Sequence, residues 1–296
     1  MAETIYRKPD RKKVFLQGEE PWGSKPYAPG STVYKGGCGL CAVTHMAIDR
    51  DYYADYDPLD LIDFMKQYTG PGKGTMWYGI TEGMKHIGLE DIKTFDGDMV
   101  GGTMKGFYEE LKKGDRIGCI LFQNPLRDVT NEKDIPKGVK YKVIKNADGS
   151  KKFVQQAADG TIWTYGGHYV SIHGIKKVNG YYWLYCKDSG GSHTGWFNYS
   201  RSMKGLIRML WVGQVPEDPI NLPTKGYFEK GDSSPEVIKI QKFLKKHKLY
   251  NGACRGNVKI LTDKGIRAYE KKFNLKVDGK FGGACLRQYV KMEVKK

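Results

Sequence analysis

The sequence predicts an α+β domain, in which helices precede an antiparallel sheet, followed by a small all-helical domain of three helices. Three observations support this prediction. Helical patterns dominate up to residue 112, strand patterns follow up to residue 212, and only helical patterns remain after a proline-rich segment. The chain of 296 residues is long enough for both cores, since a domain usually spans roughly 100–200 residues.

Four helices are expected in the first half of the larger domain. The first begins at Cys38 after a glycine-rich turn, and apolar residues recur on one face of it up to Arg50. Shorter helical patterns follow at Pro58–Tyr68, Gly79–Ile87 and Gly106–Lys112. No apolar run approaches the roughly 18–20 residues that a membrane helix needs, so no membrane insertion is predicted.

Four strands are expected in the second half of this domain, and they form its antiparallel sheet. The middle two are joined by Val178-Asn179-Gly180, which is a strong hairpin signal. A polar insertion rich in Lys and Gly occupies residues 128–164, and its Asn146-Ala147-Asp148-Gly149 predicts a hairpin tip. The four strands are Ile117–Phe122, Tyr169–Lys176, Tyr181–Lys187 and Ile207–Val212.

A linker is predicted at residues 216–226, where three prolines and mixed charge interrupt the regular patterns. The domains are therefore expected at residues 1–215 and 227–296. In the second domain, Ser234 followed by proline predicts the N-cap of the first helix. Thr262 is expected to cap the second helix, and Ala284–Val290 is the third.

The charge is concentrated near the C-terminus. The chain carries a formal net charge of +16, and residues 220–296 contain 19 basic and 7 acidic residues, which is +12 of that total. A positive field of this kind points to an anionic partner: nucleic acid, an anionic membrane or a cell-wall polymer. A surface that only improves solubility is the simpler alternative.

Six cysteines are too few for a disulfide scaffold, so reduced thiols are expected. Cys38 and Cys41 have C-x-x-C spacing, but no second pair follows at zinc-site distance, which makes a metal site or a redox pair a minor alternative. Cys38 lies between glycines at a helix start, where backbone N–H groups lower the pKa of a thiol. This favours Cys38 as a nucleophile, whereas Cys41, Cys119 and Cys186 are expected in the core.

A base for such a thiol is expected at His168, which opens a strand. The hairpin pairs this strand with the one that ends just before Asp188. That pairing places the Asp188 carboxylate within about one to three residues of His168 on the adjacent strand. The carboxylate there could orient the imidazole through its second nitrogen. The order Cys, His, Asp is that of a papain-like triad.

Further histidines and small residues are candidates for the same site. Gly37 and Gly167 leave room for a substrate beside the thiol and the imidazole, and His193 lies in a Gly/Ser loop where it could contact the substrate. His173 falls on the opposite face of the strand from His168 if side chains alternate strictly. His45 is expected to be a structural histidine inside the first helix.

Four motifs between about Val14 and Val212 carry a family resemblance. They are Gln17-Gly18-Glu19-Glu20-Pro21-Trp22, Gly37-Cys38-Gly39-Leu40-Cys41-Ala42, Gly167-His168-Tyr169-Val170 and Lys187-Asp188-Ser189. Together they resemble the bacteriocin-leader-peptidase-like group of papain-fold cysteine peptidases. The resemblance implies a papain-like fold with Cys38 as nucleophile, His168 as base, Asp188 as orienter and Gln17 as an oxyanion-hole donor. It also places Trp22 and Tyr169 near the substrate, whereas Leu40, Cys41 and Ser189 depart from the family pattern.

The C-terminal residues carry a second resemblance, from Gly226 to Tyr289. The motifs are Gln241…Leu244, Gly265-Ile266-Arg267-Ala268-Tyr269-Glu270, Asn274-Leu275 and Asp278-Gly279-Lys280-Phe281-Gly282…Cys285. They resemble the three-helix peptidoglycan-binding module, with Glu270 in place of Gln and Cys285 in place of Thr. The resemblance implies wall binding, with Tyr269, Asp278 and Gly279 as candidate wall-binding residues.

The two resemblances together imply a modular cell-wall hydrolase similar to phage endolysins. Such an enzyme cleaves an amide bond of the stem peptide or cross-bridge through the Cys-His-Asp triad. The alternatives are an N-acetylmuramoyl-L-alanine amidase with the same triad, a leader peptidase, and a non-catalytic wall-binding protein. A nucleic-acid-binding protein would explain the charge, but no motif of that class is present.

The expected partners are bacterial peptidoglycan and the anionic polymers associated with it. No nucleic acid, no metal and no cofactor is expected to bind. Residues 1–15 are charged and lack the apolar region of a signal peptide. The protein is therefore expected in the host cytoplasm after synthesis, and a holin-type release factor is implied for its access to the wall.

Overall fold

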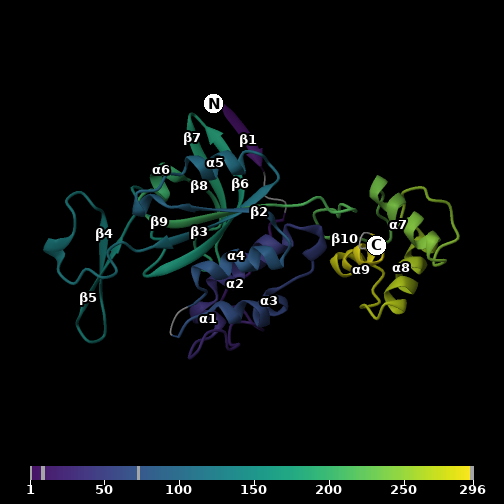
Figure 1. Cartoon of the computed structure of the whole chain (residues 1–296), viewed down its shortest axis with the longest axis horizontal. Helices are drawn as coiled ribbons and strands as arrows, with labels where there is room; N and C mark the ends of the chain where they lie inside the picture. Colours follow the sequence, from purple (N-terminus) through teal and green to yellow (C-terminus); the bar gives the residue numbers. More distant parts are fainter. Residues whose placement is uncertain (1, 8–10, 72–73, 294–296) are drawn as a thin grey trace. The chain divides into compact units, whose positions relative to one another are not determined.

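The computed structural model describes residues 2–7, 11–71 and 74–293 and divides the chain into two compact units (Figure 1). The first unit comprises Met1–Met46 and Asp57–Pro216, and the second comprises Ala47–Tyr56 and Glu217–Lys296. The short segment Ala47–Tyr56 therefore belongs with the C-terminal residues, although it lies far from them in the sequence. Within the described residues, no helix has both the length and the apolar sequence needed to cross a membrane.

A seven-stranded antiparallel sheet forms the centre of the first unit, in the order β2-β9-β3-β6-β7-β8. The strand β1 pairs with the second half of β6, beyond the part of β6 that pairs with β3. The predicted antiparallel sheet is confirmed, and it contains three strands that were not predicted, β1, β2 and β8. The strands are β1 (Glu3–Arg7), β2 (Glu90–Asp96), β3 (Arg116–Gln123), β6 (Gly167–Val178), β7 (Tyr181–Lys187), β8 (Gly195–Asn198) and β9 (Ile207–Gln214).

The four predicted helices of this unit are confirmed within about two residues at most ends, and two helical turns are additional. Figure 1 shows α1 to α4 grouped below the sheet. The helices are α1 (Val33–Gly36), α2 (Cys38–Ile48), α3 (Pro58–Met65), α4 (Trp77–His86), α5 (Lys105–Leu111) and α6 (Tyr199–Ser202). Short 3-10 turns lie at η1 (Asp51–Tyr53), η2 (Lys66–Tyr68), η3 (Asp98–Val100) and η4 (Glu132–Asp134).

Both faces of the sheet are covered, and alternation along β6 shows how. Ser171 contacts His45 of α2 at 3.3 Å, whereas Val170 and Ile172 pack in a core with residues of α5. The register between β6 and β7 shifts between Ile172 and Gly174, so one extra residue bulges there. After this bulge Ile175 joins the same core, because the alternation of the strand has moved by one residue.

The insertion at residues 128–164 forms a two-stranded ribbon of β4 (Tyr141–Lys145) and β5 (Lys151–Gln155). The predicted hairpin tip is confirmed, since the Asn146 N–H donates to the Ser150 carbonyl at 2.9 Å. At its base, the ring of Trp163 stacks on Phe122 of β3 with 4.1 Å between centroids. The aromatic contact fixes the root of the ribbon on the sheet.

The second unit contains three helices, as predicted, and a short pair of strands around its own apolar core. They are β10 (Tyr227–Phe228), α7 (Pro235–Lys246), α8 (Ile260–Lys272), β11 (Phe281–Gly282) and α9 (Gly283–Glu293). The predicted cap at Ser234 is confirmed by its bond from the Glu236 N–H at 3.1 Å. The predicted cap at Thr262 is wrong, because α8 begins at Ile260 and the Thr262 hydroxyl accepts from the Gln241 side-chain amide at 2.9 Å and donates to the Asn257 carbonyl at 3.3 Å.

Residues of the predicted linker and of the segment Ala47–Tyr56 take part in this second unit. Ile220 and Leu222 are buried in its core. The Arg50 guanidinium lies 3.1 Å from Asp218, and the Arg287 guanidinium makes a two-pronged pair with Asp55 at 2.7 and 3.0 Å. These contacts order the proline-rich segment because its apolar and acidic side chains find partners.

Candidate functional site

Cys38 is the first residue of α2, in the position that the glycine-rich turn predicts. The glycine after it is required by close packing. A Cβ atom at Gly39 would lie 2.3 Å from the Oγ1 atom of Thr75, which is itself 2.7 Å from the Tyr27 hydroxyl. Because only glycine fits here, the start of the helix can pack against Thr75 with the thiol directed toward β6.

His168 and Asp188 meet as the hairpin predicts. The Nε2 atom of His168 lies 2.6 Å from the Oδ1 atom of Asp188, and the His168 side chain also hydrogen-bonds with the Cys38 thiol. With Nε2 directed to the carboxylate, Nδ1 is the ring nitrogen that remains for the sulfur. The bulge at His173 places Ser171 opposite Lys187, and Asp188 follows directly after that pair. The structure therefore brings the three predicted residues together, with His168 hydrogen-bonded to both Cys38 and Asp188.

The Asp188 carboxylate is held by several donors. Its Oδ1 accepts from the Gly190 N–H at 2.8 Å, and its Oδ2 accepts from the His193 N–H at 3.0 Å. The His193 ring lies 3.4 Å from the same Oδ2 and contacts the Trp163 ring at a tilt of 33°, with 4.7 Å between centroids. Burial alone would raise the pKa of Asp188, but the bonds from His168 and His193 outweigh it and hold this pKa far below its usual range. Asp188 is therefore ionised at neutral pH.

The thiol and the imidazole shift each other's pKa in opposite directions. Burial opposes charge on Cys38, yet the hydrogen bond and positive charge of His168, with the N–H groups of Tyr169 and Gly39, lower the pKa of the thiol. Burial also opposes charge on His168, but Asp188 and Cys38 raise the pKa of the imidazole to about 10. The arrangement therefore favours a thiolate beside an imidazolium at neutral pH.

The other cysteines are free thiols in apolar surroundings, and burial raises the pKa of Cys41, Cys119 and Cys186. All three are buried in the core, as predicted. Two histidines are also buried and lie on either side of Ser171, whose hydroxyl is 3.3 Å from His45 and 2.8 Å from His173. His45 is thus a buried structural histidine, as predicted, whereas its link to His173 through Ser171 has no motif in the sequence.

Gln17 lies beside the end of β7. Its Nε2 donates to the Tyr34 carbonyl at 2.6 Å, and its Oε1 accepts from the Ser189 hydroxyl at 3.2 Å. One of its two amide hydrogens is thus used, and the other remains for a ligand. A cleft of about 680 Å³ opens at this point. It is lined by Leu16, Gln17, Gly18, Glu19, Tyr34, Ser189 and Gly190.

The residues predicted to contact the substrate are not among those that line this cleft. Trp22 is only 6% exposed, and its indole N–H donates to the Leu16 carbonyl, so it supports the cleft wall from behind. Tyr169 is buried under the thiol. Gly37 is buried and Gly167 is exposed at the start of β6. Leu16 and Tyr34 are lining residues outside the sequence motifs, whereas Glu19 belongs to the Gln17–Trp22 motif but had no predicted role.

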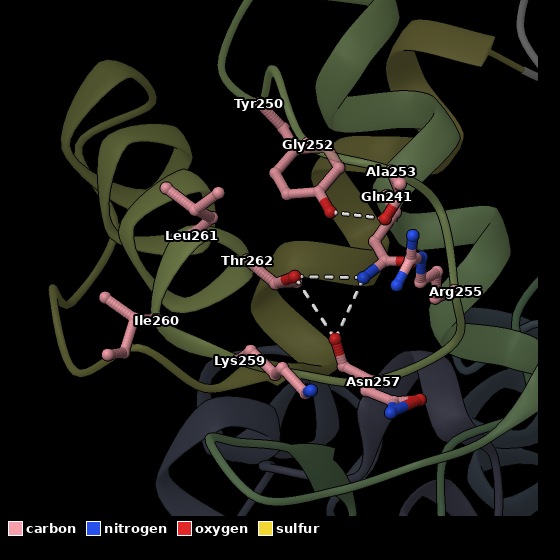
Figure 2. Close-up of a pocket in the computed structure, with 10 residues that line it drawn as sticks. All are labelled: Gln241, Tyr250, Gly252, Ala253, Arg255, Asn257, Lys259, Ile260, Leu261 and Thr262. Atoms are coloured by element: carbon pink, nitrogen blue, oxygen red, sulfur yellow. Dashed lines mark hydrogen bonds between the residues drawn. The ribbon is translucent and has the colours of Figure 1, made fainter.

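The second unit has its own pocket, of about 360 Å³, between α7 and the first turn of α8 (Figure 2). Its polar floor is formed by Gln241, which donates to Thr262 and to the Asn257 carbonyl, both at 2.9 Å. The Tyr250 hydroxyl donates to the Ala253 carbonyl at 2.7 Å. The remaining lining residues are Gly252, Arg255, Lys259, Ile260 and Leu261.

The three residues predicted for wall binding lie away from this pocket lining. Tyr269 is completely buried, and its hydroxyl donates to the Cys285 carbonyl at 3.2 Å. The Asp278 carboxylate accepts from the Lys280 N–H at 3.0 Å, within the turn that Gly279 completes with a φ of 74°. These residues shape the core and the turn, so the pocket is the better candidate for a ligand.

Glu270 is a buried acid that should make the stability of this unit depend on pH. Its carboxylate accepts from the N–H groups of Gly279 at 2.9 Å and Lys280 at 3.2 Å. Burial, and then the charge of Asp278, raise its pKa from 4.5 to about 7. The folded unit therefore holds this proton more tightly than the unfolded chain, and its stability falls as the pH rises between these two values.

We expect the Tm of the second unit to fall between about pH 5 and pH 8, by the equivalent of at most about 3 kcal/mol. Glu270→Gln should flatten that slope, because the amide does not ionise. Calorimetry of the full chain at several pH values measures it, with the exposed Glu217→Gln as control. An unchanged slope in Glu270→Gln would show that the dependence comes from other groups.

Comparison with known proteins identifies the C-terminal residues. Residues 233–288 match the family model described as "Putative peptidoglycan binding domain". The predicted peptidoglycan-binding module is thus confirmed. No curated protein matches the chain.

Several solved structures share limited similarity. The SleB N-terminal domain is 31% identical over 24% of this chain and 93% of its own, with a TM-score of 0.21. A peptidoglycan-binding protein from Clostridioides difficile, in complex with glutamine hydroxamate, is 16% identical over 57% of this chain and 89% of its own, with a TM-score of 0.20. A periplasmic domain of the EpsAB fusion protein of Vibrio vulnificus is 12% identical over 59% and 65%, with a TM-score of 0.21.

Proposed function

We propose that this protein is a cysteine-dependent peptidoglycan hydrolase with a papain-like catalytic domain that cleaves an amide bond of the wall peptide. The observation that carries the proposal is the hydrogen-bonded arrangement of Cys38, His168 and Asp188, with 2.6 Å between the imidazole and the carboxylate. The peptidoglycan-binding family of residues 233–288 indicates the substrate. A binding domain and a nucleophilic site in one chain favour a hydrolase over a binding protein alone.

The first half of the proposed reaction is attack by the Cys38 thiolate on the amide carbonyl. Negative charge then develops on the carbonyl oxygen, and the backbone N–H of Cys38 and the free amide hydrogen of Gln17 are the proposed donors to it. The His168 imidazolium gives its proton to the leaving amine as the C–N bond breaks. The acyl group remains on sulfur as a thioester.

The second half releases the acyl group. Neutral His168 takes a proton from water, and the hydroxide formed attacks the thioester carbonyl. The C–S bond breaks, the carboxylic acid product leaves, and the thiolate and imidazolium are restored. Asp188 keeps the ring orientation and the charge of His168 through both steps, because it stays ionised.

Binding through the second unit raises the local concentration of wall peptide at the first. The chemistry itself needs only residues of the first unit. Soluble wall fragments should therefore be cleaved at rates that depend little on wall binding, while cleavage of intact walls depends on both.

The test is digestion of purified cell walls, followed by mass spectrometry of the soluble fragments. An endopeptidase releases new peptide ends within the stem or cross-bridge, whereas an N-acetylmuramoyl-L-alanine amidase separates the lactyl group from L-Ala. Either product supports the proposal and identifies the bond. New reducing sugar ends without any peptide or lactyl-amide product would overturn it, and so would walls that remain intact.

A further inference from the structure

We propose that the pocket of the second unit binds the free carboxylate end of a wall stem peptide, with small apolar side chains beside it. The inference deepens the proposed function, because it names the part of peptidoglycan that the binding domain recognises. It rests on an apolar ledge, two cations and a rigid floor that meet in one pocket of about 360 Å³ (Figure 2).

The polar groups of Gln241, which forms the floor of the pocket, already have hydrogen-bond partners, and these bonds hold the side chain in place. Gln241 is 1% exposed, and both ends of its amide are engaged, since its Oε1 accepts from the Gly256 N–H at 3.1 Å. Its Nε2 donates to Thr262 and to the Asn257 carbonyl. A floor with no polar group left to desolvate provides shape at little cost when a ligand enters.

The ledge consists of Ile260 and Leu261, the first two residues of α8. They are 58% and 53% exposed, which is unusual for two adjacent aliphatic side chains at a pocket. In Figure 2 both lie on one side of the pocket, and Arg255 lies on the opposite side. A ligand between them would bury methyl groups against the ledge and present charge to the other wall.

The charge of the pocket is positive. Arg255 and Lys259 are exposed lining residues, and the residues that line the pocket include no acidic side chain. Neither cation has an ion pair among the residues that the structure describes. Arginine presents a planar pair of donors that matches a carboxylate, and Lys259 adds a second charge nearby.

These features together favour a carboxylated peptide over other wall components. An uncharged glycan would leave both cations without a partner, and a polyol phosphate has no methyl side chains for the ledge. A stem peptide has alanine methyl groups and free carboxylates within a few bonds of each other. A pocket of this volume accommodates roughly two or three small residues.

The test is calorimetric titration of the full-length Cys38→Ala variant, which should bind peptide without cleaving it. The probes are a synthetic stem tetrapeptide ending in a D-Ala carboxylate and the same peptide as a C-terminal amide. We expect the amide to bind at least about tenfold more weakly than the acid. Arg255→Gln, introduced into the Cys38→Ala variant, should weaken binding of the acid by a similar factor. It should also remove the preference for the acid over the amide, because the substitution and the amidation delete the same contact.

Ile260→Ser should weaken the binding of both peptides by the same factor, since it removes only an apolar contact of the ledge. Lys264→Gln is the matched control, because Lys264 is an exposed cation of α8 outside the pocket lining. The proposal is overturned if acid and amide bind equally, or if Arg255→Gln leaves the preference intact. It is also overturned if neither peptide binds while a GlcNAc-MurNAc disaccharide or an oligomer of glycerol phosphate does.

Hydrolysis is measured separately, with the wild-type chain and soluble muropeptides. If the acid and the amide bind equally while hydrolysis is intact, only the proposal of carboxylate binding in the pocket is overturned. Peptide binding without hydrolysis would instead contradict the proposed catalytic function and leave the pocket in place.

Discussion

Replacing Cys38 by alanine is expected to abolish wall hydrolysis, with a loss of roughly 10⁴-fold or more, while wall binding persists. The reason is chemical: no other group in the first unit combines a lowered thiol pKa with a hydrogen bond to His168 among the described residues. Removing a nucleophile that acts together with its base typically removes most of the acceleration. Release of soluble fragments from purified walls measures the rate, and co-sedimentation with walls measures binding.

Cys41→Ala is the matched control, because Cys41 is one helical turn away and is a buried thiol whose pKa burial raises. It removes one sulfur from the core and should retain hydrolysis within about tenfold. If Cys41→Ala abolished hydrolysis while Cys38→Ala retained it, the assignment of the nucleophile would be wrong. Retention in both variants would exclude thiol catalysis.

Much of the fold follows from local patterns in the sequence. The helix from Cys38 and the strand Tyr181–Lys187 are predictable because apolar periodicity and the Asn179-Gly180 turn agree with each other. The strand Glu90–Asp96 is not, because it lies at the sheet edge and its charged residues obscure any alternation. The bulge at His173 is one extra residue, and nothing in the local sequence distinguishes it.

The candidate site was predictable where chemistry limits the residue types. Cys38 stands out by its position between glycines at a helix start and His168 by its position at a strand start, and the hairpin places Asp188 near His168. Surface shape is different, since a pocket gathers residues from separate elements. Arg255 and Ile260 therefore have no signal in the sequence, and an aromatic residue such as Tyr269 looks the same in a motif whether it is buried or exposed.

Asp188→Asn is expected to lower hydrolysis at neutral pH by roughly 10²-fold or more and to move the alkaline limit of activity to lower pH. The active form needs a Cys38 thiolate and a His168 imidazolium. In the wild type His168 lowers the pKa of the thiol and the imidazole pKa is about 10, so activity should persist across neutral pH and fall near pH 10. Without the charge of Asp188, the imidazole loses its proton at lower pH, and the pKa of the thiol rises.

The measurement is the rate of alkylation of Cys38 by iodoacetamide against pH, read for each cysteine by mass spectrometry. In Asp188→Asn the His168-dependent step should lie at least about one unit below its wild-type position. Asp98→Asn is the matched control, because Asp98 also accepts a side-chain bond from Tyr199 at 2.7 Å and a backbone bond from Gly205 at 2.7 Å. No histidine bonds to Asp98 in the part of the chain that the structure describes. The substitution removes another hydrogen-bonded carboxylate of the same unit and should leave the pH profile of Cys38 unchanged. If the profile of Asp188→Asn coincided with that of the wild type, Asp188 would have only a structural role and the proposed orientation of His168 would fail.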